Sequence, residues 1–145
     1  MNLGRLVQGD TGGIIPCTPL GIIQLLENTG ETLEGKQATV LGRSRIVGLP
    51  LSILLSMKGI DATVTIVHSK TVGIEKICRE SDILISAIGV PNFVKTEWIK
   101  DNSIIVDVGI SRIEDSNKKS GYSIVGDVEK SANKVASWIT PVPGG

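Results

Sequence analysis

The sequence is poor in aromatic residues, histidine and cysteine, and each shortage limits the kind of protein it encodes. Only 3% of the 145 residues are aromatic whereas 41% are hydrophobic, so the core must be built from aliphatic side chains. The two cysteines, Cys17 and Cys78, form no Cys-x-x-Cys pair, which argues against a zinc site or a disulfide framework. The single histidine, His68, has no visible catalytic partner, so we expect it to line a cofactor site or lie at the surface.

The sequence also lacks a net charge and a long apolar run. Lysine and arginine number 15, and so do aspartate and glutamate, so bulk electrostatics favour neither nucleic acid nor an anionic membrane as a partner. The longest apolar stretch, residues 49–57, is too short to cross a bilayer. The N-terminus shows no basic segment followed by an apolar run, the mark of a signal peptide. We therefore expect a soluble, cytoplasmic α/β domain.

Short apolar segments rich in β-branched residues recur along the chain and predict strands. The middle three are apolar almost without interruption, as strands buried on both faces of a parallel sheet must be. The predicted strands are residues 37–41, 63–67, 83–87, 104–108 and 123–125.

Helical patterns alternate with these strands. The first predicted helix opens at Thr18-Pro19 and stops at Gly30, and the last is capped by Asp127. The others cover residues 48–58, 71–80 and 96–100, and the last covers 128–138. This alternation predicts an α/β fold with a doubly wound, mostly parallel sheet and helices on both faces, as in Rossmann-like proteins.

The turn after the first predicted strand, within residues 40–50, is the most informative segment. It lies at the edge of the sheet where doubly wound folds bind nucleotides. Gly42 would allow a sharp turn, and free N–H groups at the following helix start would hold a pyrophosphate. The segment departs from the G-x-G-x-x-G fingerprint, because Ser44 replaces the second glycine and Gly48 comes one position late. A strand–helix turn without a ligand is the alternative interpretation.

Residues after the second predicted strand favour NADP over NAD. An NAD site usually carries an acidic residue at the end of that strand, to bind the ribose 2′-hydroxyl. Asp61 precedes the strand and is at the wrong end. His68, Ser69 and Lys70 follow it instead, and with Arg43 they supply the cations and hydroxyl that suit a 2′-phosphate. His68 and Lys70, taken singly, are better explained as exposed loop residues, so Arg43 is the strongest candidate.

Six short motifs occur along nearly the whole chain. They are Pro16-Cys17-Thr18-Pro19, Gly42-Arg43-Ser44-x-x-Val47-Gly48-x-Pro50, Val67-His68-Ser69-Lys70-Thr71, Asp107-Val108-Gly109-Ile110, Gly126-Asp127-Val128 and Pro141-Val142-Pro143-Gly144-Gly145. Together, and in this order, they resemble the bifunctional methylenetetrahydrofolate dehydrogenase/methenyltetrahydrofolate cyclohydrolase family, and specifically its C-terminal NAD(P)-binding domain. The segment 114–120, predicted to be a solvated loop, is longer than in compact members.

The resemblance implies two reactions for the intact enzyme. The first transfers a hydride from 5,10-methylenetetrahydrofolate to NADP+, and the second hydrolyses the methenyl product to 10-formyltetrahydrofolate. By position, Gly42, Arg43 and Ser44 would hold the adenosine-side phosphates and Ser69 would face the same region. Ile110 would contact the nicotinamide end of the cofactor.

The resemblance also implies what this chain leaves to other parts of the enzyme. The terminal Pro143, Gly144 and Gly145 would open a loop beside the folate. In the family, hydrolysis depends on a lysine in a Tyr-x-x-x-Lys pattern of a preceding domain, and that pattern is absent here. We therefore expect neither a catalytic residue nor a metal site in this chain. It is expected to be one NADP-binding domain, residues 1–145, inactive as a fragment and paired as a homodimer.

Other functions and roles stay open from the sequence. The chain is also compatible with a truncated or degenerate module that binds NADP without catalysis, and with another NADP oxidoreductase of the doubly wound class. Asp107, at a strand end, is equally consistent with a residue that tunes the site and with a structural carboxylate. Cys17 precedes a helix, where we expect a packing role rather than a nucleophile.

Overall fold

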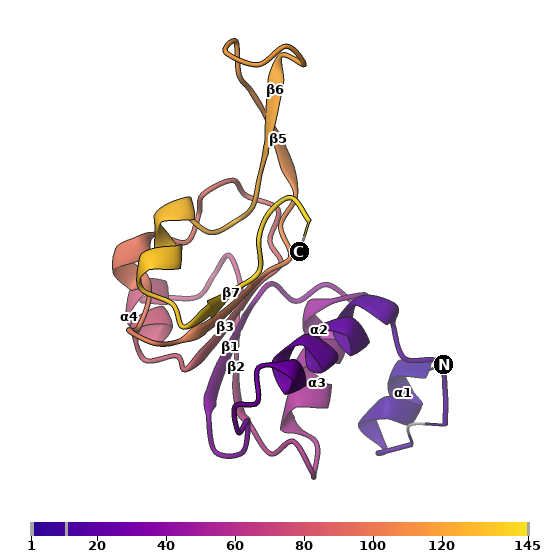
Figure 1. Cartoon of the computed structure of the whole chain (residues 1–145). Coiled ribbons are helices and arrows are strands. Elements are labelled where there is room, and N and C mark those ends of the chain that lie inside the picture. The colour runs from indigo at the N-terminus through magenta and orange to yellow at the C-terminus, as the bar shows by residue number, and fades with distance from the viewer. Residues whose placement is uncertain (1, 11, 145) are drawn as a thin grey trace.

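The main sheet of the computed structural model, which describes residues 2–10 and 12–144, has five parallel strands in the order β2-β1-β3-β4-β7 (Figure 1). They are β1 (Gln37–Leu41), β2 (Thr63–Val67), β3 (Ile83–Ser86), β4 (Ile104–Asp107) and β7 (Trp138–Ile139). The chain moves outward from β1 to β2 and then returns to the other side of β1. This reversal creates a crevice at the carboxyl edge between β1 and β3, the usual place for a ligand in open parallel sheets.

Helices cover both faces of the sheet, as predicted. They are α1 (Asn2–Val7), α2 (Cys17–Asn28), α3 (Gly48–Ser56) and α4 (Ile74–Arg79), with the 3₁₀ turns η1 (Thr96–Trp98) and η2 (Lys130–Lys134). Two apolar cores result, one beneath α2 and α3 and one beneath α4, η1 and η2. β3 serves both, because Ile83 and Ile85 enter the first core and Leu84 enters the second. Burial on both faces explains the unbroken apolar sequence of this strand.

The predicted fifth strand, 123–125, is not part of the parallel sheet. It belongs to β6 (Tyr122–Val125), which pairs antiparallel with β5 (Ser111–Glu114), a strand that we did not predict. The resulting hairpin projects from the body of the domain (Figure 1). The guanidinium of Arg112 lies 4.8 Å from the centre of the Tyr122 ring and ties the two strands together. The segment 114–120 forms the end of β5 and the tip of this hairpin.

The predicted helix 128–138 is also wrong. Val128 is buried and bridges to Val94, and only the short η2 follows before the chain becomes β7. Trp138 and Ile139 then pair with Ile104 and Ile105 of β4. Pairing with β4 therefore overrides the local helical pattern.

Two other predicted helices are shorter than expected. The helix predicted at 71–80 begins only at Ile74, because Gly73 has a φ of 72° and a closed turn precedes it. The helix predicted at 96–100 is the 3₁₀ turn η1. No helix within the described residues has the length and apolarity needed to cross a membrane.

Candidate nucleotide-binding site

The turn between β1 and α3 presents unpaired backbone N–H groups at the carboxyl edge of the sheet. No hydrogen bond among the described residues uses the N–H groups of residues 43–46, which are exposed. The side chain of Ser44 is engaged in the turn itself, because its Oγ accepts from the N–H of Val47 at 3.1 Å and of Gly48 at 3.3 Å. A row of free N–H groups leading into a helix forms an anion site, so the geometry fits a pyrophosphate.

Two glycines allow this turn to lie tightly against the sheet. Gly42 has a φ of 110°, and a Cβ there would lie 2.6 Å from the carbonyl oxygen of Ala87. A Cβ on Gly48 would lie 2.1 Å from the carbonyl oxygen of Gly42. The predicted sharp turn at Gly42 is confirmed. The late position of Gly48 has a structural reason, because this glycine brings the start of α3 against the turn.

The residues that follow β2 lie beside this turn, because β1 and β2 are neighbouring parallel strands. Their turn is closed internally: the N–H of His68 donates to Oγ1 of Thr71 at 3.0 Å, and the N–H of Thr71 donates back to the carbonyl oxygen of His68 at 2.9 Å. Nδ1 of His68 accepts from the N–H of Lys70 at 3.2 Å. His68 is thus a turn-forming residue, which agrees with a wall of the site rather than with acid–base catalysis.

The side chains around this edge carry positive charge without local acidic partners. The ion pairs of the described residues do not include Arg43, Arg45 or Lys70. Ser69 is exposed beside them, and residues 68–73, which join β2 to α4, contain no carboxylate. The predicted grouping of Arg43, Ser69 and Lys70 at one edge of the sheet therefore fits a phosphate better than a ribose hydroxyl.

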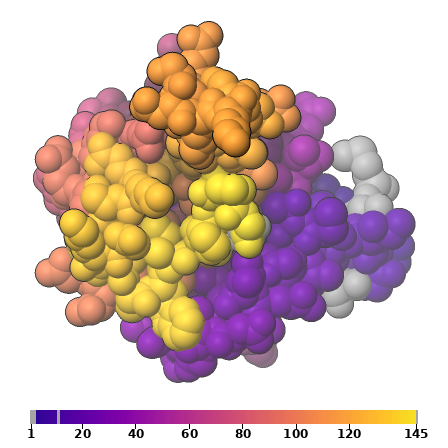
Figure 2. All heavy atoms as spheres, turned by 45° about the horizontal axis from the view of Figure 1, so that its top comes forward, coloured from indigo at the N-terminus to yellow at the C-terminus, as the bar shows by residue number. Residues whose placement is uncertain are grey.

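A separate cavity of about 450 Å³ lies at the same edge, beyond β4. Ile110, which is 74% exposed, lines it together with Pro143 and Gly144. In Figure 2 the last residues of the chain, in yellow, lie between the orange hairpin and the indigo-to-purple segment that contains α2. The structure thus brings Ile110, Pro143 and Gly144 together but does not place Gly42, Arg43 or Ser44 in that cavity. Gly145 lies outside the described residues.

Asp107 ends β4 at the border of this cavity and is a structurally engaged carboxylate. It accepts from the N–H groups of Gly109 at 2.9 Å, Asp127 at 3.0 Å and Val128 at 3.0 Å. A Cβ on Gly126 would lie 1.9 Å from its Oδ2, so only glycine fits there. Burial raises the pKa of the Asp107 carboxyl above its usual range, and the nearby charge of Asp127 adds to the effect.

Asp127 is the residue that sequence reasoning interpreted least well. It is fully buried and does not cap a helix. Its Oδ2 accepts from the N–H of Ile88 at 2.8 Å, the N–H of Gly89 at 3.2 Å and Oγ of Ser86 at 3.1 Å. Asp127 therefore holds the end of β3, the segment against which Gly42 packs. Its place between Gly126 and Val128 in a motif was the only signal in the sequence.

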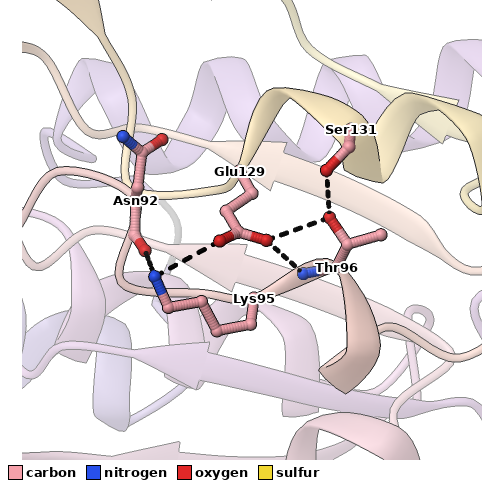
Figure 3. Close-up of polar contacts among 5 residues, drawn as sticks. All are labelled: Asn92, Lys95, Thr96, Glu129 and Ser131. Atoms are coloured by element: carbon pink, nitrogen blue, oxygen red, sulfur yellow. Dashed lines mark hydrogen bonds and ion pairs between the residues drawn. The ribbon is translucent and has the colours of Figure 1, made fainter.

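A polar cluster joins the loop after β3 to Glu129, just before η2, and to Ser131 within it (Figure 3). Oε2 of Glu129 accepts from the N–H of Thr96 at 2.9 Å and from its Oγ1 at 3.1 Å. Oγ1 of Thr96 and Oγ of Ser131 lie 2.5 Å apart. Nζ of Lys95 donates to the carbonyl oxygen of Asn92 at 2.8 Å and lies 3.3 Å from Oε1 of Glu129.

Glu129→Gln should lower the free energy of unfolding at pH 7, and acid should remove the difference. The N–H of Thr96 and the ammonium of Lys95 hold the pKa of Glu129 below its usual range. A depressed pKa stabilises the fold above the unfolded value of about 4.3 and ceases to do so as the pH falls through the folded value. Urea unfolding of both proteins at pH 7 and at about pH 3.5 measures this. Equal differences at both pH values would contradict it.

The two cysteines differ in their exposure to solvent. Cys78 is buried, and burial raises its thiol pKa to about 11, so little thiolate forms at neutral pH. Cys17 is exposed, so the packing role predicted for it is wrong.

Comparison with known proteins decides the family. The tetrahydrofolate dehydrogenase/cyclohydrolase NAD(P)-binding domain matches residues 16–145. The chain belongs to this family. It is 50% identical over its whole length to bifunctional protein FolD 4, chloroplastic, of Arabidopsis thaliana, and 50% identical to the cytoplasmic C-1-tetrahydrofolate synthase of Spodoptera frugiperda. The resemblance seen in the motifs is thereby confirmed.

A solved structure of the tetrahydrofolate dehydrogenase/cyclohydrolase family shares the fold. The Trypanosoma brucei methylenetetrahydrofolate dehydrogenase-cyclohydrolase, determined with NADP and an inhibitor, is 45% identical and superposes with a TM-score of 0.89 over 99% of this chain. The predicted Rossmann-like fold is confirmed. The chain spans 49% of the trypanosomal protein, 40% of the Arabidopsis protein and 15% of the Spodoptera protein.

Proposed function

We propose that the chain is the NADP-binding domain, residues 1–145, of a bifunctional methylenetetrahydrofolate dehydrogenase/cyclohydrolase. The observation that carries the proposal is the row of free N–H groups at residues 43–46. Cations without an ion pair among the described residues flank it, and the segment 68–73 after β2 contains no carboxylate. In the intact enzyme, the proposed reactions are oxidation of 5,10-methylenetetrahydrofolate with NADP+ and hydrolysis of the methenyl product to 10-formyltetrahydrofolate. The trypanosomal relative that binds NADP supports this choice of cofactor.

Each site residue has a specific role in this proposal. Gly42 and Ser44 shape the turn whose N–H groups bind the adenosine-side phosphates, and Arg43 binds the 2′-phosphate with help from Ser69. Ile110 contacts the nicotinamide end. Pro143, Gly144 and Gly145 pass beside the tetrahydrofolate substrate.

The chain contributes position rather than proton transfer to these reactions. Bound NADP supplies the hydride acceptor, and the turn and the cavity hold its two ends in place. No catalytic residue of this chain is proposed, and we expect residues 1–145 alone to be inactive. Among the described residues, no group of three or more His, Cys, Asp or Glu side chains is arranged to hold a metal ion.

Calorimetric titration tests the nucleotide site. We expect NADP+ to bind more tightly than NAD+, and Arg43→Ala to weaken NADP+ binding about tenfold while changing NAD+ binding little, because a guanidinium–phosphate contact contributes about 1.4 kcal/mol or more. Arg79→Ala is the matched control, since Arg79 is exposed at the far end of α4. Tighter NAD+ binding would overturn the cofactor. Absence of binding would favour a degenerate module.

A chimera tests the activity of the whole enzyme. Residues 1–145 would replace the corresponding segment of the Arabidopsis relative, and formation of NADPH from methylenetetrahydrofolate would be followed by its absorbance. Dehydrogenase activity that falls with Arg43→Ala supports the proposal. A folded chimera that binds NADP+ but does not turn over folate would contradict it.

A homodimer in the cytoplasm completes the proposal. Sedimentation at twice the 15.3 kDa mass would support pairing, and sedimentation as a monomer would contradict it. A cytoplasmic location has support from the Spodoptera relative, whereas the Arabidopsis relative is chloroplastic, so imaging of the tagged full-length protein decides it.

A further inference from the structure

The ionisable group on the wall of the cavity lined by Ile110 is acidic. Among the described residues that line it, Asp107 is the only one with an ionisable side chain. Directly behind it, Asp127 is fully buried and donates its N–H to Oδ1 of Asp107. Two carboxylates therefore stand together at the end of the cavity where the proposed nicotinamide site lies.

Within residues 2–10 and 12–144, no cation forms an ion pair with either carboxylate. The ion pairs of the described residues include neither Asp107 nor Asp127, whose hydrogen-bond donors are neutral N–H and O–H groups. Lys118 and Lys130 lie on the hairpin side of Asp107, in a separate hollow, and both are exposed, so water screens their charges. The raised pKa of Asp107 agrees with a carboxylate that has lost much of its hydration.

We propose that the Asp107–Asp127 pair makes this site bind the oxidised nucleotide in preference to the reduced one. The nicotinamide ring carries a positive charge in NADP+ and none in NADPH, because the hydride that it receives brings one negative charge. A fixed negative field at the ring stabilises the first form and leaves the second unaffected. The inference rests on the proposed function, which places the ring near Ile110. A site with this preference would hold NADP+, the reactant, and release NADPH, the reduced product.

Asp127→Asn removes the charge of this side chain while keeping its hydrogen bonds. The asparagine carbonyl can take the place of Oδ2 and keep its three donors, while the amide nitrogen takes the place of Oδ1, which has no donor among the described residues. Asp82→Asn is the matched control. It removes the same charge from the opposite edge of the sheet, where Asp82 accepts from Lys100 and from the N–H of Gln37.

The experiment measures the dissociation constants of NADP+ and NADPH for wild type, Asp127→Asn and Asp82→Asn. We expect Asp127→Asn to reduce the preference for NADP+ by about three- to tenfold, the size of a screened unit charge, and Asp82→Asn to leave it unchanged. Asp107→Asn, which should act in the same direction, provides a second variant if Asp127→Asn does not fold. Equal weakening of both nucleotides would show a merely structural role and overturn the inference. If wild type binds neither nucleotide, the proposed function fails, and the inference fails with it.

Discussion

Gly48→Ala should destabilise the domain by about 3 kcal/mol and abolish NADP+ binding. The added Cβ would lie 2.1 Å from the carbonyl oxygen of Gly42 and 3.0 Å from the backbone nitrogen of Arg43, so it collides with main chain that no rotamer change can move. Relief requires α3 to shift away from the turn. The free N–H groups at residues 43–46 would then lose their common orientation, and affinity would fall together with stability.

Gly4→Ala is the control for this substitution. Gly4 lies in α1, and a Cβ there would have no heavy atom within 4 Å, so alanine should be neutral or slightly stabilising. Urea unfolding gives the free energies, and calorimetry gives the NADP+ affinity. A Gly48→Ala protein with wild-type stability and affinity would show that Gly48 does not pack against the backbone of Gly42 and Arg43 as described.

Asp127→Ala should cost a similar free energy, about 3 kcal/mol, through a different mechanism. It leaves the buried hydroxyl of Ser86 and the N–H groups of Ile88 and Gly89 without their acceptor, and it opens a void where the fully buried carboxyl was. Asp127→Asn should lower the free energy of unfolding much less, because the carbonyl remains as an acceptor.

Asp82→Ala is the matched control for this loss. The side chain of Asp82 accepts two hydrogen bonds, one fewer than that of Asp127, and it is 26% exposed. Water therefore replaces part of what is lost, and we expect a cost of about 1 kcal/mol. Unfolding of the variants in urea at pH 7 compares them. A smaller loss for Asp127→Ala than for Asp82→Ala would contradict the anchoring role given to Asp127.

The sequence predicted the parts of the fold that local pattern determines. β1 and β2 have the predicted bounds, and β3 and β4 each end one residue earlier. The predicted burial on both faces holds for β3 and β4, whose segments are nearly all buried. It is wrong for β2, which is an edge strand with Thr63, Thr65 and Ile66 exposed. The sharp turn after β1 was also predicted, since Gly42 comes directly after a strand. Both the strands and the turn are determined by residues close together in the sequence.

The errors fall where distant residues determine the structure. β7 consists of two residues, and its partners in β4 lie more than thirty positions earlier, so no local pattern distinguishes it from the end of a helix. Asp127 has the form of a helix cap, but its acceptor oxygen is bonded to groups 38–41 positions away. A single sequence contains no record of which distant N–H group a carboxylate will meet.

The support that Asp127 gives to the end of β3 has a consequence for synthesis on the ribosome. Gly42 and its turn leave the exit tunnel before Asp127 does. Asp127 accepts from the hydroxyl of Ser86 and the N–H of Ile88, the two neighbours of Ala87, against which Gly42 packs. A nascent chain can therefore assemble β1, α3 and β2 before the turn after β1 has a rigid backing. That backing is completed only once Asp127 has emerged, after β1 to β4 have been made.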